Sequence, residues 1–178
     1  MTPSPWVLRF APLVPPGGAV LDLAAGGGRH ARLFLDRGCR VLALDRDVSG
    51  LAGLAGRPGL EIVAADLEDG SPWPLAGCRF DAVVVTNYLH RPLLPLLVAA
   101  VAPGGLLLYE TFGRGNERFG RPANPDFLLE PGELLAAVAG ALRVVAYECG
   151  RIDRPRPAVV QRICAMRAAP DAVPPLLP

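Results

Sequence analysis

VLDLAAGGGRHARLFLDRGCRVLALD, from Val20 to Asp45, contains two apolar runs separated by glycines and a more polar segment. Val20 to Leu23 is the first apolar run, and the consecutive glycines Gly26 to Gly28 follow it after two alanines. Arg29 to Arg37 has the composition of a helix, and Val41 to Leu44 is apolar again. This order predicts a βαβ unit with its glycines at the first strand-to-helix turn.

The glycine turn and the acidic end of this unit indicate a cofactor site. Glycine lets the backbone approach a ligand closely, because it has no Cβ. Asp45 ends the second strand, where a carboxylate can accept both hydroxyls of a ribose. Together they predict a cofactor that carries adenosine. The spacing Gly26-x-Gly28-x-x-Ala31 also fits the dinucleotide fingerprint, so the glycines alone leave the cofactor open.

Two further acidic residues favour S-adenosylmethionine. Asp22 lies inside the first strand, where its carboxylate would repel a pyrophosphate but suits an ammonium and a sulfonium. Asp66 ends a later apolar run and can accept the adenine amino group, while the Leu67 N–H serves a ring nitrogen. In the alternative interpretation, Asp22 and Asp66 merely cap the ends of strands.

These segments resemble class I S-adenosylmethionine-dependent methyltransferases. Val20 to Asp45 resembles their motif I and acidic second-strand end, and AADLEDGSPWPL, from Ala64, resembles their adenine-binding loop. Phe80 to His90 is similar to their fourth strand, and Ala102 to Thr111 to their fifth. Within the class, Gly26 to Arg29 is similar to the tellurite-resistance type.

The resemblance implies the cofactor S-adenosylmethionine, the product S-adenosylhomocysteine and a Rossmann-like fold. One departure is the pair Ala24-Ala25, where many relatives have glycine and cysteine. We expect one methyltransferase domain over residues 1–167, with 1–18 as an N-terminal arm and 168–178 as a mobile proline-rich tail. The residues predicted to bind the cofactor are Asp22, Ala24, Gly26, Gly28, Asp45, Arg46, Asp66, Leu67 and Asn87.

The rest of the chain alternates between strand and helix patterns. This alternation predicts a three-layer α/β fold with a mainly parallel sheet, whose ligands bind at the carboxyl ends of the strands. A short link makes the last two strands an antiparallel pair. Residues 6–10 form either a short helix or an extended arm. The predicted strands are 60–64, 80–86, 106–110, 142–149 and 158–167, and the predicted helices are 48–55, 92–101 and 133–139.

Composition limits the classes of function. The 178 residues are 51% hydrophobic, which suits one domain with a packed core. A net charge of +1 argues against nucleic acid as a partner. All 18 basic residues are arginine, which excludes a lysine base or Schiff base. Four cysteines without C-x-x-C spacing and two histidines predict no metal site.

The most apolar region, residues 92–109, is interrupted by Pro95, Pro103, Gly104 and Gly105. It is therefore predicted to be helix, turn and strand, with no membrane span. No signal peptide is recognised, so we expect a cytoplasmic protein with reduced thiols. The oligomeric state stays open.

Methyl transfer from a sulfonium needs little more than a positioned acceptor, because the leaving group is already activated. After the fourth strand, Tyr88 and His90 are candidate catalytic residues. His90 would be a base or would orient the acceptor; its alternative role is to cap the next helix. The segment Thr86 to Leu89 lacks the prolines of an Asn-Pro-Pro-Tyr motif, which argues against methylation of adenine.

The segment Thr111 to Pro131 is long for a loop in a compact domain. We expect it to form the wall or lid of the acceptor site, and the alternative is an ordinary surface Ω-loop. Its arginines indicate a small, polar or anionic acceptor. The residues predicted to bind that substrate are Arg91, Arg114, Asn116 and Arg118.

Two other functions stay open. One is an NAD(P)-dependent oxidoreductase, in which Arg46 would contact a 2′-phosphate. The other is a non-catalytic module that binds a cofactor or a partner.

Overall fold

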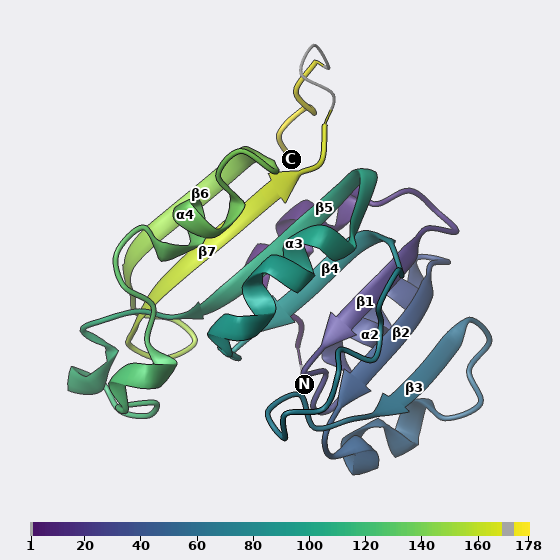
Figure 1. Ribbon diagram of the computed structural model, residues 1–178, viewed down its shortest axis with the longest axis horizontal. Coiled ribbons are helices and arrows are strands. Elements are labelled where there is room, and N and C mark those ends of the chain that lie inside the picture. The colour runs from purple at the N-terminus through teal and green to yellow at the C-terminus, as the bar shows by residue number, and fades with distance from the viewer. Residues whose placement is uncertain (1, 169–172) are drawn as a thin grey trace.

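The computed structural model describes residues 2–168 and 173–178, and its centre is one seven-stranded sheet in the order β3-β2-β1-β4-β5-β7-β6 (Figure 1). β1 to β5 pair in parallel, and β7 runs antiparallel to both β5 and β6. The predicted mainly parallel sheet with an antiparallel last strand is confirmed. The strands are β1 (Ala19–Leu23), β2 (Arg40–Asp45), β3 (Leu60–Ala64), β4 (Phe80–Thr86), β5 (Val101–Phe112), β6 (Arg143–Ile152) and β7 (Ala158–Met166).

Helices cover both faces of the sheet and make three layers. In Figure 1, α3 and α4 lie on the face toward the viewer and α2 lies behind the sheet. The strand order reverses between β1 and β4, so a ligand site is expected at their carboxyl ends. The α-helices are α1 (Pro5–Phe10), α2 (Arg29–Asp36), α3 (Leu94–Ala100) and α4 (Glu133–Val138), and the 3₁₀ turns are η1 (Ala11–Leu13), η2 (Val48–Leu54), η3 (Arg91–Leu93), η4 (Asn116–Arg118) and η5 (Pro125–Phe127).

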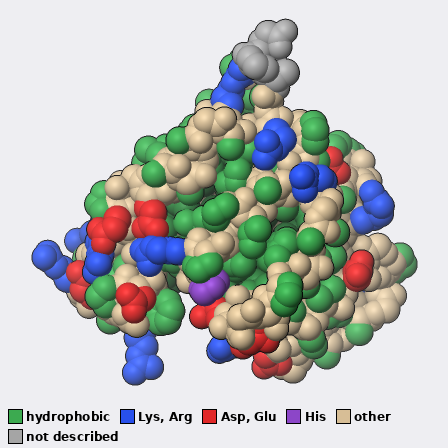
Figure 2. Space-filling view, viewed as in Figure 1, with side chains coloured by type: hydrophobic (Ala, Val, Ile, Leu, Met, Phe, Trp, Pro, Cys, Tyr) green, Lys and Arg blue, Asp and Glu red, His purple; other side chains and the backbone are tan. Residues whose placement is uncertain are grey.

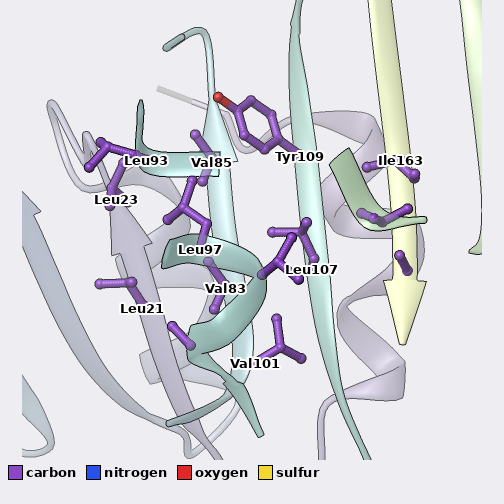
Figure 3. Packing of buried hydrophobic residues seen from close by; sticks show 14 of the residues in the cluster. Leu21, Leu23, Val83, Val85, Leu93, Leu97, Val101, Leu107, Tyr109 and Ile163 are labelled. Atoms are coloured by element: carbon purple, nitrogen blue, oxygen red, sulfur yellow. The ribbon is translucent and has the colours of Figure 1, made fainter. Parts of the chain in front are cut away.

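Alternate strand residues build the two cores. Leu21 and Leu23 of β1 face α3 and α4, together with the branched residues of β4 and β5 that Figure 3 shows. Val20 and its neighbours point to the other face, against α1, α2 and η2. In the first core, the Tyr109 hydroxyl donates to the Tyr88 carbonyl oxygen at 2.9 Å. This bond fixes the chain just beyond the end of β4.

The N-terminal arm is helical, so the extended alternative is wrong. Trp6 is buried, and its indole N–H donates to the Ile163 carbonyl oxygen on β7 at 3.2 Å. The Ser4 hydroxyl donates to Glu110 Oε1 on β5 at 2.9 Å. The arm therefore packs against the sheet and reaches the carboxyl end of β5.

Several predicted boundaries differ from the structure. The segment expected as a helix at 48–55 is the 3₁₀ turn η2, and the helix expected at 92–101 is divided between η3 and α3. β5 is longer than predicted because it pairs with β4 from Val101 and with β7 as far as Phe112. Of the predicted tail, residues 169–172 lie outside the described residues.

Candidate active site

The glycine turn between β1 and α2 packs directly against η2. Gly28 has a φ of +69°, and a Cβ there would lie 2.6 Å from Leu54 Cδ1. A Cβ on Gly50 of η2 would lie 2.7 Å from the Gly26 carbonyl oxygen. Glycine is required at Gly28 and Gly50 because a side chain would separate the two segments. Gly50 therefore allows the close contact between η2 and the glycine turn.

Asp45 at the end of β2 holds the turn in place. Its Oδ2 accepts the Gly26 N–H at 2.8 Å, and its Oδ1 accepts the Asp47 N–H at 3.0 Å. The carboxylate borders a hollow of about 320 Å³, which we call the Asp45 hollow. The Asp45 hollow is lined by Ala24, Leu44, Asp45, Arg46, Ala65, Asp66, Leu67, Glu68, Tyr88 and Phe127.

The structure thus brings five of the predicted cofactor residues to one hollow, from three different strand ends. Asp66 follows β3, and its Oδ1 accepts the Glu68 N–H at 2.9 Å. Tyr88, which follows β4, forms another wall of the hollow. Burial is the main cause that raises the pKa of its hydroxyl, and the nearby Glu68 carboxylate raises it further. Phe127 enters from η5 although its ring is 46% exposed. Phe127 was not predicted as a site residue.

A second hollow lies on the other side of the glycine turn and the end of β4. This Arg29 hollow has a volume of about 430 Å³, and Arg29 and Asn87 line it. Ala24 at the start of the same turn and Tyr88, the residue after Asn87, line the Asp45 hollow instead. Asn87 has a φ of +57°, a conformation that asparagine tolerates better than most residues. Arg29 reaches the same strand end, where its Nη2 lies 3.3 Å from Thr86 Oγ1. Arg29 was not predicted as a site residue.

Asp22 does not line either hollow. It lies on the face of β1 that α2 covers, and its Oδ2 accepts the Ala31 N–H at 2.8 Å. Burial raises the pKa of Asp22 to about 7. The neighbouring His30 is neutral, because burial lowers its pKa to about 3 and its Nε2 accepts the Ser4 N–H. Asp22 therefore bonds to the start of α2, and its predicted contact with the cofactor stays a prediction.

The predicted acceptor residues are not brought together. His90 lines a third hollow of about 690 Å³, formed with residues 64–74 and including Trp73. Tyr88 faces the Asp45 hollow instead, and Asn87 faces the Arg29 hollow. His90 precedes η3, but its side chain makes no capping hydrogen bond within the described residues.

Arg91 of η3 and Asn116 of the segment after β5 have structural roles. Arg91 pairs with Glu133 at 2.7 Å and donates to the carbonyl oxygens of Asp126 and Leu128. Asn116 is buried and bonds to Val159 N and Pro122 O. Both side chains, which were predicted to bind a substrate, are thus engaged in contacts within the protein.

Arg114 forms an ion pair with Glu130 at 2.6 Å, and Arg118 is exposed on η4. Figure 2 shows acidic and basic side chains gathered over this segment, between β5 and α4. Neither arginine lines any of the three hollows. The segment is therefore held by ion pairs and by the buried Leu128 and Leu129, and it contributes Phe127 to the site.

No group of three or more histidine, cysteine or acidic side chains among residues 2–168 and 173–178 has the arrangement of a metal site. Nor does that part of the chain contain a helix with the length and apolarity needed to cross a membrane.

Known proteins that resemble this chain are methyltransferases. Residues 21–107 match the family described as methyltransferase domain. A demethylmenaquinone methyltransferase of Renibacterium salmoninarum is 33% identical over 54% of this chain and 42% of its own length. A trans-aconitate 2-methyltransferase of Methylobacterium nodulans is 32% identical over 84% of this chain and 56% of its own length. The chain spans about half the length of these curated relatives.

Solved structures share the fold. TehB from Haemophilus influenzae has a TM-score of 0.70 at 18% identity, covering 90% of this chain and 61% of that one. The 1,6-didemethyltoxoflavin-N1-methyltransferase of Burkholderia thailandensis, solved with 1,6-didemethyltoxoflavin and S-adenosylhomocysteine, has a TM-score of 0.65 at 22% identity, covering 92% and 76%. With the sheet order and the glycine turn, these matches show that the chain shares the Rossmann-like fold of S-adenosylmethionine-dependent methyltransferases.

Proposed function

We propose that this protein transfers the methyl group of S-adenosylmethionine to a small-molecule acceptor and releases S-adenosylhomocysteine. The observation that carries the proposal is the Asp45 hollow. It joins a carboxylate fixed beside the glycine turn to Asp66, Leu67 and the aromatic ring of Phe127. These groups match an adenosine, which has ribose hydroxyls to donate and an apolar base to cover.

The lining residues suggest how the cofactor lies. Asp45 accepts the ribose hydroxyls, while Asp66 and the Leu67 N–H meet the adenine edge. Arg29 supplies the positive charge that the methionyl carboxylate needs, because it follows the glycine turn and borders the second hollow. Bound S-adenosylmethionine supplies an activated methyl group, and Asn87 marks the side from which an acceptor approaches it.

A small acceptor is supported by the volume of the Arg29 hollow and by the relatives. About 430 Å³ is in the range of sites for small molecules. The names of the relatives refer to demethylmenaquinone, trans-aconitate and 1,6-didemethyltoxoflavin, all small molecules. With His90 outside both hollows, we propose that positioning, rather than a histidine base, supplies most of the catalysis.

Calorimetry with S-adenosylhomocysteine, S-adenosylmethionine and NADH tests the cofactor. We expect micromolar dissociation constants for both sulfur compounds, or roughly 7–8 kcal/mol of binding free energy, and no tight binding of NADH. Incubation with labelled S-adenosylmethionine and fractionated cell extract then tests turnover. Tight NADH binding without affinity for either sulfur compound would overturn the proposal. Cofactor binding with no labelled product from any fraction would favour a non-catalytic module.

A further inference from the structure

Part of the wall of the Arg29 hollow makes no contact with the cofactor in the position proposed above. One side comes from the N-terminal arm, including Pro5 and Leu8, and the other from the turn between β6 and β7. Phe112 of β5 and Val160 of β7 also line the hollow. Segments far apart in the sequence therefore enclose a partly apolar space directly beyond the expected position of the methyl group.

The turn between β6 and β7 brings two positive charges to this wall, on Arg154 and Arg156. Neither forms an ion pair with a carboxylate in the part of the chain that the structure describes. Arg156 is nevertheless held in place. Its guanidinium lies 5.8 Å from the centre of the Phe112 ring, and its Nη2 donates to the Arg121 carbonyl oxygen at 3.4 Å.

The one carboxylate that lines the hollow, among the described residues, is already paired. Glu110 Oε2 lies 2.9 Å from Arg162 Nε, and Glu110 Oε1 accepts the Ser4 hydroxyl at 2.9 Å. Arg29 is assigned above to the carboxylate of the cofactor. Two positive charges, those of Arg154 and Arg156, thus remain for whatever fills the rest of the space.

We propose that the methyl acceptor is a small anion with an apolar body, and that Arg154 and Arg156 bind its anionic group. The apolar body lies against Phe112, Leu8 and Val160, and its nucleophilic atom faces Asn87. This inference rests on the proposed function and names the acceptor class of that site. It places recognition of the anionic group on the β6–β7 turn rather than at His90 or on the arginines of the 111–131 segment.

A matched pair of probes tests the charge preference: 2-naphthoate and its neutral amide, 2-naphthamide. Each is titrated calorimetrically into the protein saturated with S-adenosylhomocysteine. We expect 2-naphthoate to bind at least tenfold more tightly than the amide. Arg154→Gln and Arg156→Gln should each weaken the binding of 2-naphthoate by roughly ten- to a hundredfold, the range for a lost charge-assisted hydrogen bond. The affinity for the amide should stay unchanged in both variants.

Arg151→Gln is the control on the same hairpin. Arg151 pairs with Asp153 at 2.8 Å, lies outside the hollow and carries the same charge. Its loss tests whether net charge or hairpin stability explains the effect, and we expect 2-naphthoate binding within twofold of the original protein. Equal affinity for the two probes, no binding of either, or an equal loss in Arg151→Gln would overturn the inference.

Failure of the inference can be told apart from failure of the proposed function. S-Adenosylhomocysteine affinity is measured for every variant, and Arg154→Gln and Arg156→Gln should keep it within about threefold. If the cofactor binds but the anion preference is absent, only the acceptor class is wrong. Labelled product found in the RNA fraction of a cell extract would also overturn the inference of a small anionic acceptor, in favour of a nucleic-acid substrate.

Discussion

Replacing Gly50 by alanine is a sharp test of how the cofactor site is built. Gly50 belongs to η2, outside both hollows, and its backbone does not require a positive φ. The substitution should act only through the added methyl. That methyl would lie 2.7 Å from the Gly26 carbonyl oxygen and 3.2 Å from the Gly27 Cα.

The size of the effect follows from what must move. Both contacts are with backbone atoms, so no side chain can rotate away, and either η2 or the glycine turn must shift by several tenths of an ångström. Overpacking of this kind typically costs about 1–3 kcal/mol. For a chain of this size that lowers the melting temperature by roughly 2–12 °C. Because Gly26 donates to Asp45, the shift should also weaken cofactor binding.

Gly53→Ala is the matched control. Gly53 lies in the same 3₁₀ turn, and a Cβ there would meet no atom within 4 Å. It should be neutral or should stabilise by about 0.4–1 kcal/mol through the unfolded state. Thermal unfolding and calorimetry with S-adenosylhomocysteine are measured for both variants. If Gly50→Ala and Gly53→Ala behave alike in both assays, the close contact between η2 and the glycine turn does not build the site.

Three other perturbations have defined outcomes. Asp45→Asn should weaken S-adenosylhomocysteine by roughly ten- to a hundredfold in calorimetry, whereas Asp47→Asn, outside the hollow, should not; equal losses would place the ribose elsewhere. Burial raises the pKa of Asp22 from 3.8 to about 7, so the native state loses stability as the pH rises through that window. The free energy of unfolding of Asp22→Asn, measured with urea, should therefore rise relative to that of the original protein by up to roughly 4 kcal/mol between pH 4 and 7. A difference between the two proteins that does not change with pH would refute the raised pKa of Asp22. Phe127→Ala should weaken S-adenosylhomocysteine by roughly two- to tenfold, whereas Phe119→Ala, exposed in the same segment but outside the hollow, should leave it unchanged.

Local patterns in the sequence were sufficient to predict the layered fold, much of the strand plan and the methyltransferase match. Residues 60–64 and 80–86 form strands with the predicted bounds, because each is an apolar run between turn residues. The glycine turn and Asp45 also lie where the βαβ pattern predicts them. These signals are contained within about 25 residues and do not depend on the rest of the chain.

Side-chain direction and long-range neighbours were not predictable in the same way. Asp22 shares one face of β1 with Val20, and only the packing of α2 on that face reveals that its carboxylate is buried. From the sequence alone Arg91 could be taken for an unpaired cation, because its partner Glu133 lies 42 residues away along the chain. Phe127 and Arg154 reach the two hollows from segments without periodicity, so their positions depend on tertiary packing alone.

A crystal structure of the protein with S-adenosylhomocysteine tests the central claim most directly. We expect the ribose hydroxyls on Asp45, the adenine beside Asp66 and Phe127, and the methionyl carboxylate toward Arg29, with the sulfur facing the Arg29 hollow. A ribose without contact to Asp45, or an adenine that touches neither Asp66 nor Phe127, would contradict the account.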